Sequence, residues 1–82
     1  MPRYMFHSQT DHRLHDEEGV DLPGPVEARH EAVRLVGEMI KEAPAPFWGS
    51  RPWNVTVTDG SGLILWEVFV DGVASPATAN LG

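Results

Sequence analysis

Three histidines and an aspartate near the N-terminus have the residue types best suited to chemistry. His7, His12, His15 and Asp16 lie within ten consecutive positions. Imidazole nitrogens and carboxylate oxygens together bind zinc and similar divalent ions, so this group is a candidate metal site. Its spacing matches none of the dense patterns typical of metal-binding motifs. The alternative is a polar turn whose histidines are solvated.

A run of carboxylates overlaps this group. Asp16, Glu17 and Glu18 are adjacent, and Asp21 follows three residues later. Neighbouring carboxylates can raise one another's pKa for acid–base work or bind a hard cation. The run lacks the regular alternate ligand positions of a calcium loop, so we expect a solvated turn ahead of a helix. No serine lies in a nucleophile-elbow motif. We therefore expect no catalytic residues and no enzyme.

Large apolar side chains in the second half of the chain indicate a binding surface. The chain has three tryptophans, a residue type enriched at the energetic centres of protein interfaces. One helix can cover only one face of a sheet, so a second apolar face needs a partner or a connector folded back over it. We expect a protein partner or a homodimer there. The predicted contact residues are Phe47 and Trp48 in an exposed loop, and Ile64, Trp66 and Val68 on the last strand.

These residues must be positioned by a small set of elements. Alternating apolar and polar residues predict strands over 3–8 and 53–58, with a short strand at 13–15. Apolar residues at helical spacing predict an amphipathic helix from Pro25 to the residue before Pro44. Residues 43–52 form a proline-rich connector. The turn Asp59–Gly62 leads into a return strand over 63–70, and the following strand argues against a phosphate-binding loop.

This order predicts an α+β fold, a small antiparallel β-β-α-β-β sheet with one amphipathic helix packed on one face. We expect a single domain over residues 1–73 and a flexible C-terminal tail over residues 74–82. The tail is composed mainly of small and polar residues.

Composition excludes several classes of function. The 82 residues contain no cysteine, which rules out disulfides, thiolate metal sites and thiol redox chemistry. The formal charge is −6 and the six basic residues are scattered, so we expect no nucleic-acid binding. No stretch approaches the roughly 20 apolar residues of a membrane span, and no signal peptide is evident. We expect a cytoplasmic protein with no cofactor and no membrane contact.

Several short motifs in a fixed order resemble a family of short bacterial proteins of unknown function. The resemblance rests on the start Met1–His7, the segment Asp16–Leu22, the helical Ala28–Ala32 with its A-x-x-E-A pattern, and Val57–Gly62. The late strand contributes Leu65 and Phe69. The chain departs from the pattern at Met5, where the family has an aromatic residue, and in its connector. The resemblance covers about residues 1–72. It implies a cytoplasmic α+β domain and no assigned activity.

Overall fold

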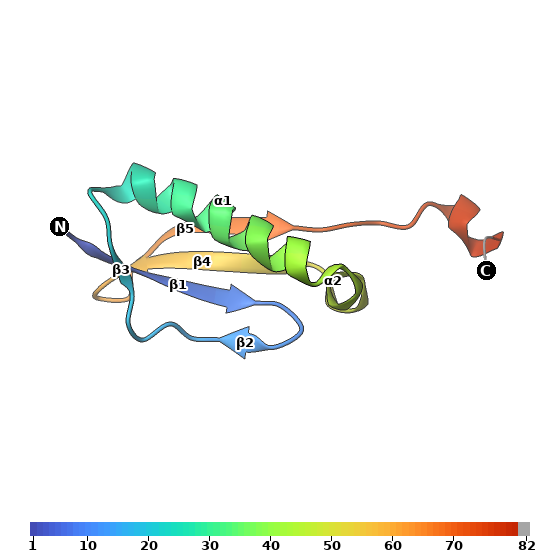
Figure 1. Cartoon of the computed structure of the whole chain (residues 1–82), viewed down its shortest axis with the longest axis horizontal. Coiled ribbons are helices and arrows are strands. Elements are labelled where there is room, and N and C mark those ends of the chain that lie inside the picture. Colours follow the sequence, from blue (N-terminus) through green and yellow to red (C-terminus); the bar gives the residue numbers. More distant parts are fainter. Residues whose placement is uncertain (81–82) are drawn as a thin grey trace.

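The computed structural model describes residues 1–80, and one antiparallel sheet forms its centre (Figure 1). The helix α1 lies across one face of this sheet. The predicted α+β fold, with one helix packed on an antiparallel sheet, is confirmed. In chain order the elements are β1 (Arg3–Gln9), β2 (Arg13–Leu14), β3 (Val20–Asp21), α1 (Pro25–Glu42), α2 (Pro44–Ser50), β4 (Trp53–Asp59), β5 (Ile64–Val70) and the 3-10 helix η1 (Pro76–Asn80).

The strand order places β1 and β4 in the middle of the sheet and β5 at one edge. Along the sheet the order is β2-β1-β4-β5, and each neighbouring pair is antiparallel. The outer edge of β1 is shared by two short strands: β2 pairs with its C-terminal end and β3 with its N-terminal end. The sequence did not predict β3, because a strand of two residues is too short to show an alternation.

The core lies between α1 and the inner face of the sheet. Ala28 and Ala32 are fully buried where α1 crosses the strands, and Val36 is buried one turn later. Alanines at this contact have little side chain to hold the backbones apart, so the helix packs close to the sheet. The strands contribute the larger buried residues, which are Tyr4, Phe6, Trp53, Val55 and Val57.

The connector after α1 folds into a second helix, so its prediction as an irregular loop was wrong. Proline is favoured at the first position of a helix, where its missing N–H leaves no hydrogen bond unmade. Pro44 therefore both prevents α1 from continuing and starts α2. This helix buries Phe47, whose ring meets Trp53 edge-on at 5.5 Å between centroids. Phe47 is thus a core residue rather than an exposed one, whereas Trp48 remains half-exposed.

An irregularity in β5 reverses the predicted face of part of this strand. Val57 is opposite Trp66 but Thr58 is opposite Ile64, so Leu65 is an extra residue on β5. Such a bulge shifts the alternation of side chains by one position. Ile64 therefore lies on the face opposite α1, while Trp66 and the more C-terminal Val68 pack against the helix-side core. The prediction that Trp66 and Val68 line the uncovered face was wrong.

The C-terminal segment runs away from the sheet. In Figure 1 the chain leaves β5 in an extended conformation and ends in η1, far from α1. The predicted tail of residues 74–82 includes residues 81 and 82, which lie outside the described part of the chain. Within residues 1–80, none of the helices combines the length and the apolar composition that crossing a membrane requires.

The close approach of α1 to the sheet gives a first prediction. Ala32→Leu adds a bulky side chain at a site with no exposed surface. We expect the free energy of unfolding to fall by about 1–3 kcal/mol, the usual cost of overpacking a filled core. Urea unfolding followed by tryptophan fluorescence measures this change. Ala45→Leu on the exposed side of α2 is the matched control, and an equal loss in both variants would contradict the prediction.

Candidate functional site

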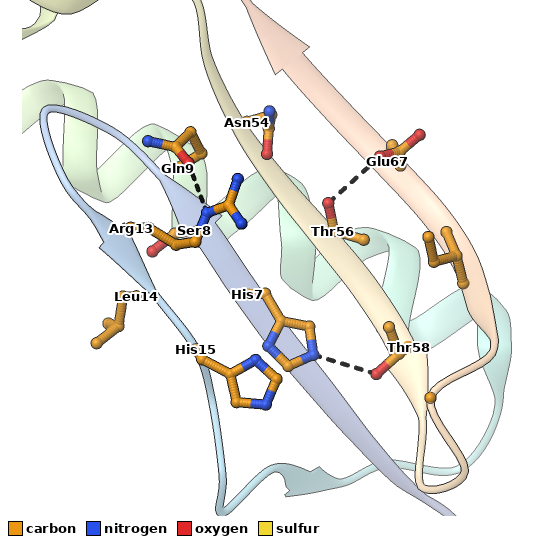
Figure 2. Close-up of a pocket in the computed structure, with 12 residues that line it drawn as sticks. His7, Ser8, Gln9, Arg13, Leu14, His15, Asn54, Thr56, Thr58 and Glu67 are labelled. Atoms are coloured by element: carbon orange, nitrogen blue, oxygen red, sulfur yellow. Dashed lines mark hydrogen bonds between the residues drawn. The ribbon is translucent and has the colours of Figure 1, made fainter.

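The face of the sheet opposite α1 carries an open groove. No helix within residues 1–80 packs on this face (Figure 1). It contains an open groove of about 480 Å³ that crosses β1, β4 and β5 and is bounded by the β2 segment (Figure 2). Most of the residues that line it have polar side chains, among them His7, Arg13, His15, Thr56, Thr58 and Glu67.

Two of the predicted metal ligands, His7 and His15, lie together in this groove. Their rings stack with centroids 4.3 Å apart. The Asp16 N–H donates to His7 Nδ1 at 3.0 Å, so this nitrogen is the acceptor and the ring proton belongs on Nε2. Nε2 then donates to Thr58 Oγ1, 3.3 Å away. The neutral form of His7 is thus hydrogen-bonded at both ring nitrogens.

The other two predicted ligands have different roles. His12 lies in the loop between β1 and β2, where its Nδ1 is 3.1 Å from Asp11 Oδ1. The Asp16 carboxylate accepts three backbone N–H groups, from Phe6, Glu18 and Gly19, at 3.0–3.1 Å. Across residues 1–80, no three histidine, cysteine, aspartate or glutamate side chains gather in a geometry that could hold a metal ion. The four predicted ligands are therefore not brought together as one site.

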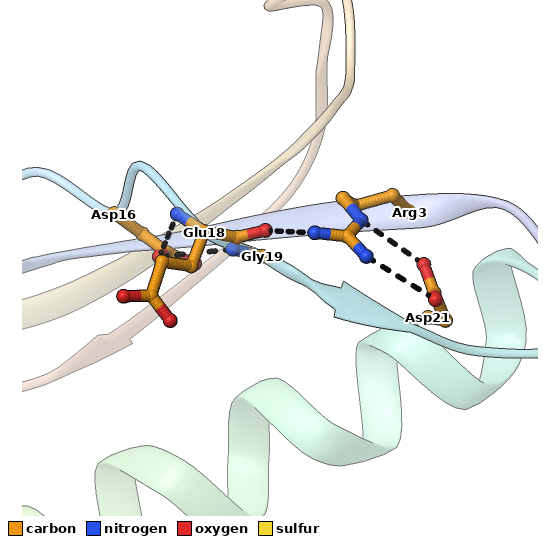
Figure 3. Close-up of polar contacts among 5 residues, drawn as sticks. All are labelled: Arg3, Asp16, Glu18, Gly19 and Asp21. Carbon is orange, nitrogen blue, oxygen red and sulfur yellow. Dashed lines mark hydrogen bonds and ion pairs between the residues drawn. The ribbon is translucent and has the colours of Figure 1, made fainter.

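The acidic run holds the loop against β1 (Figure 3). The Arg3 guanidinium donates to both carboxylate oxygens of Asp21, at 3.1 and 3.3 Å, and to the Glu18 carbonyl oxygen at 2.6 Å. Gly19 has a φ of +74°, and a Cβ there would lie 2.9 Å from the Tyr4 carbonyl oxygen. Only glycine adopts this conformation readily at so close an approach. The run is a structural turn that positions β3.

These contacts close the outer edge of β1. Strand β2 pairs with one end of β1 and β3 with the other, which leaves Phe6 between them. The Phe6 N–H points outward, and Asp16 Oδ2 accepts it at 3.0 Å. A side-chain carboxylate thus replaces the missing strand at the middle of this edge. A closed edge cannot add a further strand.

The opposite edge of the sheet, β5, has free backbone groups. Successive residues of a strand point their N–H and C=O groups to alternate sides. Because the Phe6 N–H points away from β4, the backbone N–H and C=O groups of its neighbours Met5 and His7 point towards β4. Carried across the registers to β5, this alternation turns the backbone groups of Glu67 and Phe69 outward. No strand within residues 1–80 pairs with this side of β5.

Two exposed apolar residues of β5 lie on the open face of the sheet. Phe69 lies on the open face and is 61% exposed, and Ile64 on the same face is 57% exposed. Sequence reasoning missed Phe69, because without the bulge it falls on the opposite face from Ile64. Trp48 lies elsewhere, on α2, with the Arg51 guanidinium 4.9 Å from its ring centroid. The interface role of Trp48 and Ile64 stays a prediction.

Comparison with known proteins places this fold in a family. One family model matches residues 3–71, a range that includes every strand and both α-helices. This chain belongs to the family described as a domain of unknown function, DUF6894. Neither a curated protein nor a solved structure matches it. The predicted membership of a family of unknown function is confirmed. The bacterial source and the short motifs ascribed to the DUF6894 family stay predictions.

The Asp16 carboxylate gives the DUF6894 domain a second prediction. Asp16→Asn replaces one acceptor oxygen by an NH₂ group, which cannot accept the N–H groups directed at it. We expect a loss of about 1–3 kcal/mol in the free energy of unfolding, the usual cost of an unsatisfied group. Thermal and urea unfolding measure it. Glu17→Gln changes the adjacent exposed carboxylate and should have little effect; equal losses would contradict the assignment.

The same network predicts how stability depends on pH. Burial and the neighbouring His15 lower the pKa of His7, and the nearby Asp16 carboxylate raises it without reversing the shift. The unfolded chain therefore takes up a proton at His7 before the folded domain does. Stability should fall as the pH drops below about 6.5, the ordinary pKa of histidine. Urea unfolding between pH 7.5 and 5 tests this, and His7→Gln should flatten the decline. An unchanged slope in His7→Gln would contradict it.

Proposed function

We propose that this chain is a non-enzymatic protein-interaction module that binds a partner strand along the free edge of β5. The proposal rests on the difference between the two edges of the sheet, one of which is closed while the other is unpaired. The edge at β1 is closed by β2, by β3 and by the Asp16 carboxylate. The edge at β5 is seven residues long and unpaired within residues 1–80. Addition of an extended strand to an exposed sheet edge is a recurrent mode of protein recognition.

The composition of β5 supports strand addition. Natural sheets protect exposed edges with lysine, proline or very short strands. The sequence of β5 is Ile-Leu-Trp-Glu-Val-Phe-Val, with no proline and with Glu67 as its one charged residue. An unprotected edge of this length favours pairing with another chain. The net charge of −6 makes a protein a better partner than a nucleic acid.

The hydrogen bonds of the open face argue against catalysis there. Thr58 and His7 are close enough to serve as a nucleophile and its base. However, the N–H of Asp16 occupies the acceptor nitrogen of His7, so the nitrogen facing Thr58 carries a proton and cannot remove another. Thr58 is also buried. This arrangement supports an interaction module rather than an enzyme.

A second candidate function is the binding of a small polar ligand at the open groove. The groove of about 480 Å³ favours it, because its volume is in the usual range for ligand sites. The stacked pair of His7 and His15 lies within it. Native mass spectrometry of untagged protein separates the two functions. A single chain that carries the mass of a small molecule supports this candidate, whereas added protein mass supports strand addition.

The free edge gives a fourth prediction. Phe69→Pro removes an outward N–H but keeps the β4–β5 hydrogen bonds, so proline is tolerated at this kind of position. We expect the fold to survive, as judged by circular dichroism. We also expect the association constant of the higher-mass species, measured by size-exclusion chromatography with light scattering, to fall at least tenfold. Phe69→Val keeps the N–H and is the matched control.

Hydrogen exchange locates the contact in the unaltered chain. In the bound species, the amides of Glu67 and Phe69 should exchange at least tenfold more slowly than in the dilute monomer. Protection confined to β1, with unchanged exchange in β5, would overturn the proposal. Binding by Phe69→Pro equal to that of the unaltered chain would also overturn it.

A further inference from the structure

We propose that the strand added to β5 is β5 of a second copy, antiparallel about a two-fold axis that passes beside Val68. This inference rests on the proposed function and names its partner. The joined sheet would run β2-β1-β4-β5 in one copy and then β5-β4-β1-β2 in the other. A two-fold interface uses the same patch on both copies, so that patch must be complementary to itself. The charges and side chains of β5 and α1 meet this requirement in one register.

The faces of the sheet restrict the possible registers. A two-fold axis perpendicular to the sheet keeps both α1 helices on the same side. Residues directly opposite each other in an antiparallel pair point to the same face. Trp66, Val68 and Val70 face the helix, while Glu67 and Phe69 face the groove side. Each helix-facing residue must therefore meet a helix-facing residue of the other copy.

The one charge on β5 selects among the remaining registers. If Glu67 is on the axis, two carboxylates face each other, which is destabilising. If Phe69 is on the axis, Glu67 faces Asp71 of the other copy, and two carboxylates meet again. With Val68 on the axis, Glu67 is opposite Phe69, and Trp66 is opposite Val70. This register avoids both carboxylate pairs. Registers centred on Trp66 or Val70 avoid them too, but the first crosses the bulge at Leu65 and the second lies at the end of the strand, so both pair fewer residues.

The outward backbone groups fit the same register. Glu67 and Phe69 turn their N–H and C=O groups to the free side of β5. Opposite each other across the axis, they form two hydrogen-bonded pairs with two N–H···O=C bonds each. The Val68 pair between them is of the non-hydrogen-bonded type, which brings the side chains closest together. Two valines at this position bury apolar surface on the helix side of the sheet.

The helix beside β5 extends the self-complementary patch. Arg29 of α1 lies over the Trp66 ring, 4.9 Å from its centroid, which identifies the flank of the helix next to β5. Val26, Val33 and Ile40 share this flank, because residues seven apart in a helix lie on one stripe. Val26 and Val33 are 46% and 55% exposed, although both are apolar. In the two-fold dimer, this stripe faces its copy across the joined sheet.

The glutamates of α1 lie on the flank away from the proposed contact. Helical spacing places the glutamates of α1 together on the opposite flank from Val26 and Val33. The flank beside β5 therefore has no carboxylate, in a chain with twelve acidic and six basic residues. Carboxylates of two acidic chains repel each other, so a flank without them favours the approach of a second copy. The segregated glutamates are Glu27, Glu31, Glu38 and Glu42.

Single cysteines test the register directly, because the chain has none of its own. With Val68 on the axis, the two Cα atoms at position 68 lie about 4.5 Å apart, within disulfide range. Val68→Cys should form a disulfide-linked dimer in a glutathione redox buffer. Glu67→Cys and Phe69→Cys lie on diagonals of about 7–8 Å to their own copies. Each alone should form at least tenfold less dimer, and a mixture of the two should form the heterodimer.

A surface variant tests the contact without a change in the strand. Val33→Glu places a carboxylate on the exposed stripe of α1 and should raise the dimer dissociation constant at least tenfold in analytical ultracentrifugation. Leu14→Glu makes a similar change at the closed edge, where Leu14 is 59% exposed, and should leave the constant unchanged. The unaltered chain should sediment at twice its 9.1 kDa mass. A monomer at millimolar concentration, or equal weakening by both variants, would overturn the inference.

The outcomes separate this inference from the proposed function. If β5 amides become protected only in a complex with a different protein, the second-copy inference fails and strand addition stands. If Glu67→Cys or Phe69→Cys forms the disulfide more readily than Val68→Cys, the Val68 register fails while edge pairing stands. If β5 amides stay unprotected in every bound species, both proposals fail.

Discussion

A buried backbone N–H needs a hydrogen-bond acceptor, and at the closed edge of the sheet the Asp16 carboxylate supplies one where no strand pairs. It accepts the Phe6 N–H between β2 and β3, and it also accepts the N–H groups of Glu18 and Gly19. The Asp16 N–H in turn orients His7 on the open face. One residue thus closes an edge and shapes the acidic loop through its carboxylate, and sets the proton position in the groove through its backbone N–H. Buried polar groups that are fully paired in this way stabilise one arrangement of the chain.

Because the edge at β1 is closed, β5 is the edge at which a partner strand can add. Both edges belong to a sheet that a single helix covers, and the chain has no disulfide to support its thin core. Domains of this size bury a smaller share of their surface than larger ones, and association with a partner is one way to bury more. The long unpaired β5 and the exposed valines of α1 are adjacent to each other. Pairing there would add strands to the sheet and cover apolar surface of both β5 and α1.

The open face and the free edge meet at β5. Glu67 lines the groove and hydrogen-bonds to Thr56 across the strands, while its backbone points outward at the edge. Phe69 is exposed on the same face. Joining two copies at β5 therefore places their two grooves on the same side of one continuous sheet. A molecule bound in one groove would lie beside the interface, which couples the two surfaces physically.

Local patterns in the sequence predicted the strands β1, β4 and β5, the helix α1 and the hairpin that joins β4 to β5. Alternation over 53–58, helical spacing after Pro25 and the turn at Asp59–Gly62 are properties of neighbouring residues, so they can be read without the fold. The same is true of the acidic turn and of the absence of thiol chemistry. The tertiary structure decided which residues meet. The extra residue Leu65 separates Ile64 from Trp66 and Val68, and a bulge depends on the partner strand rather than on β5 itself. Burial of Phe47 required Trp53 to be in place. His12 is set apart from His7 by the turn between β1 and β2, in which Thr10 and Asp11 hold it. These outcomes depend on contacts between distant residues, which spacing along the chain does not contain.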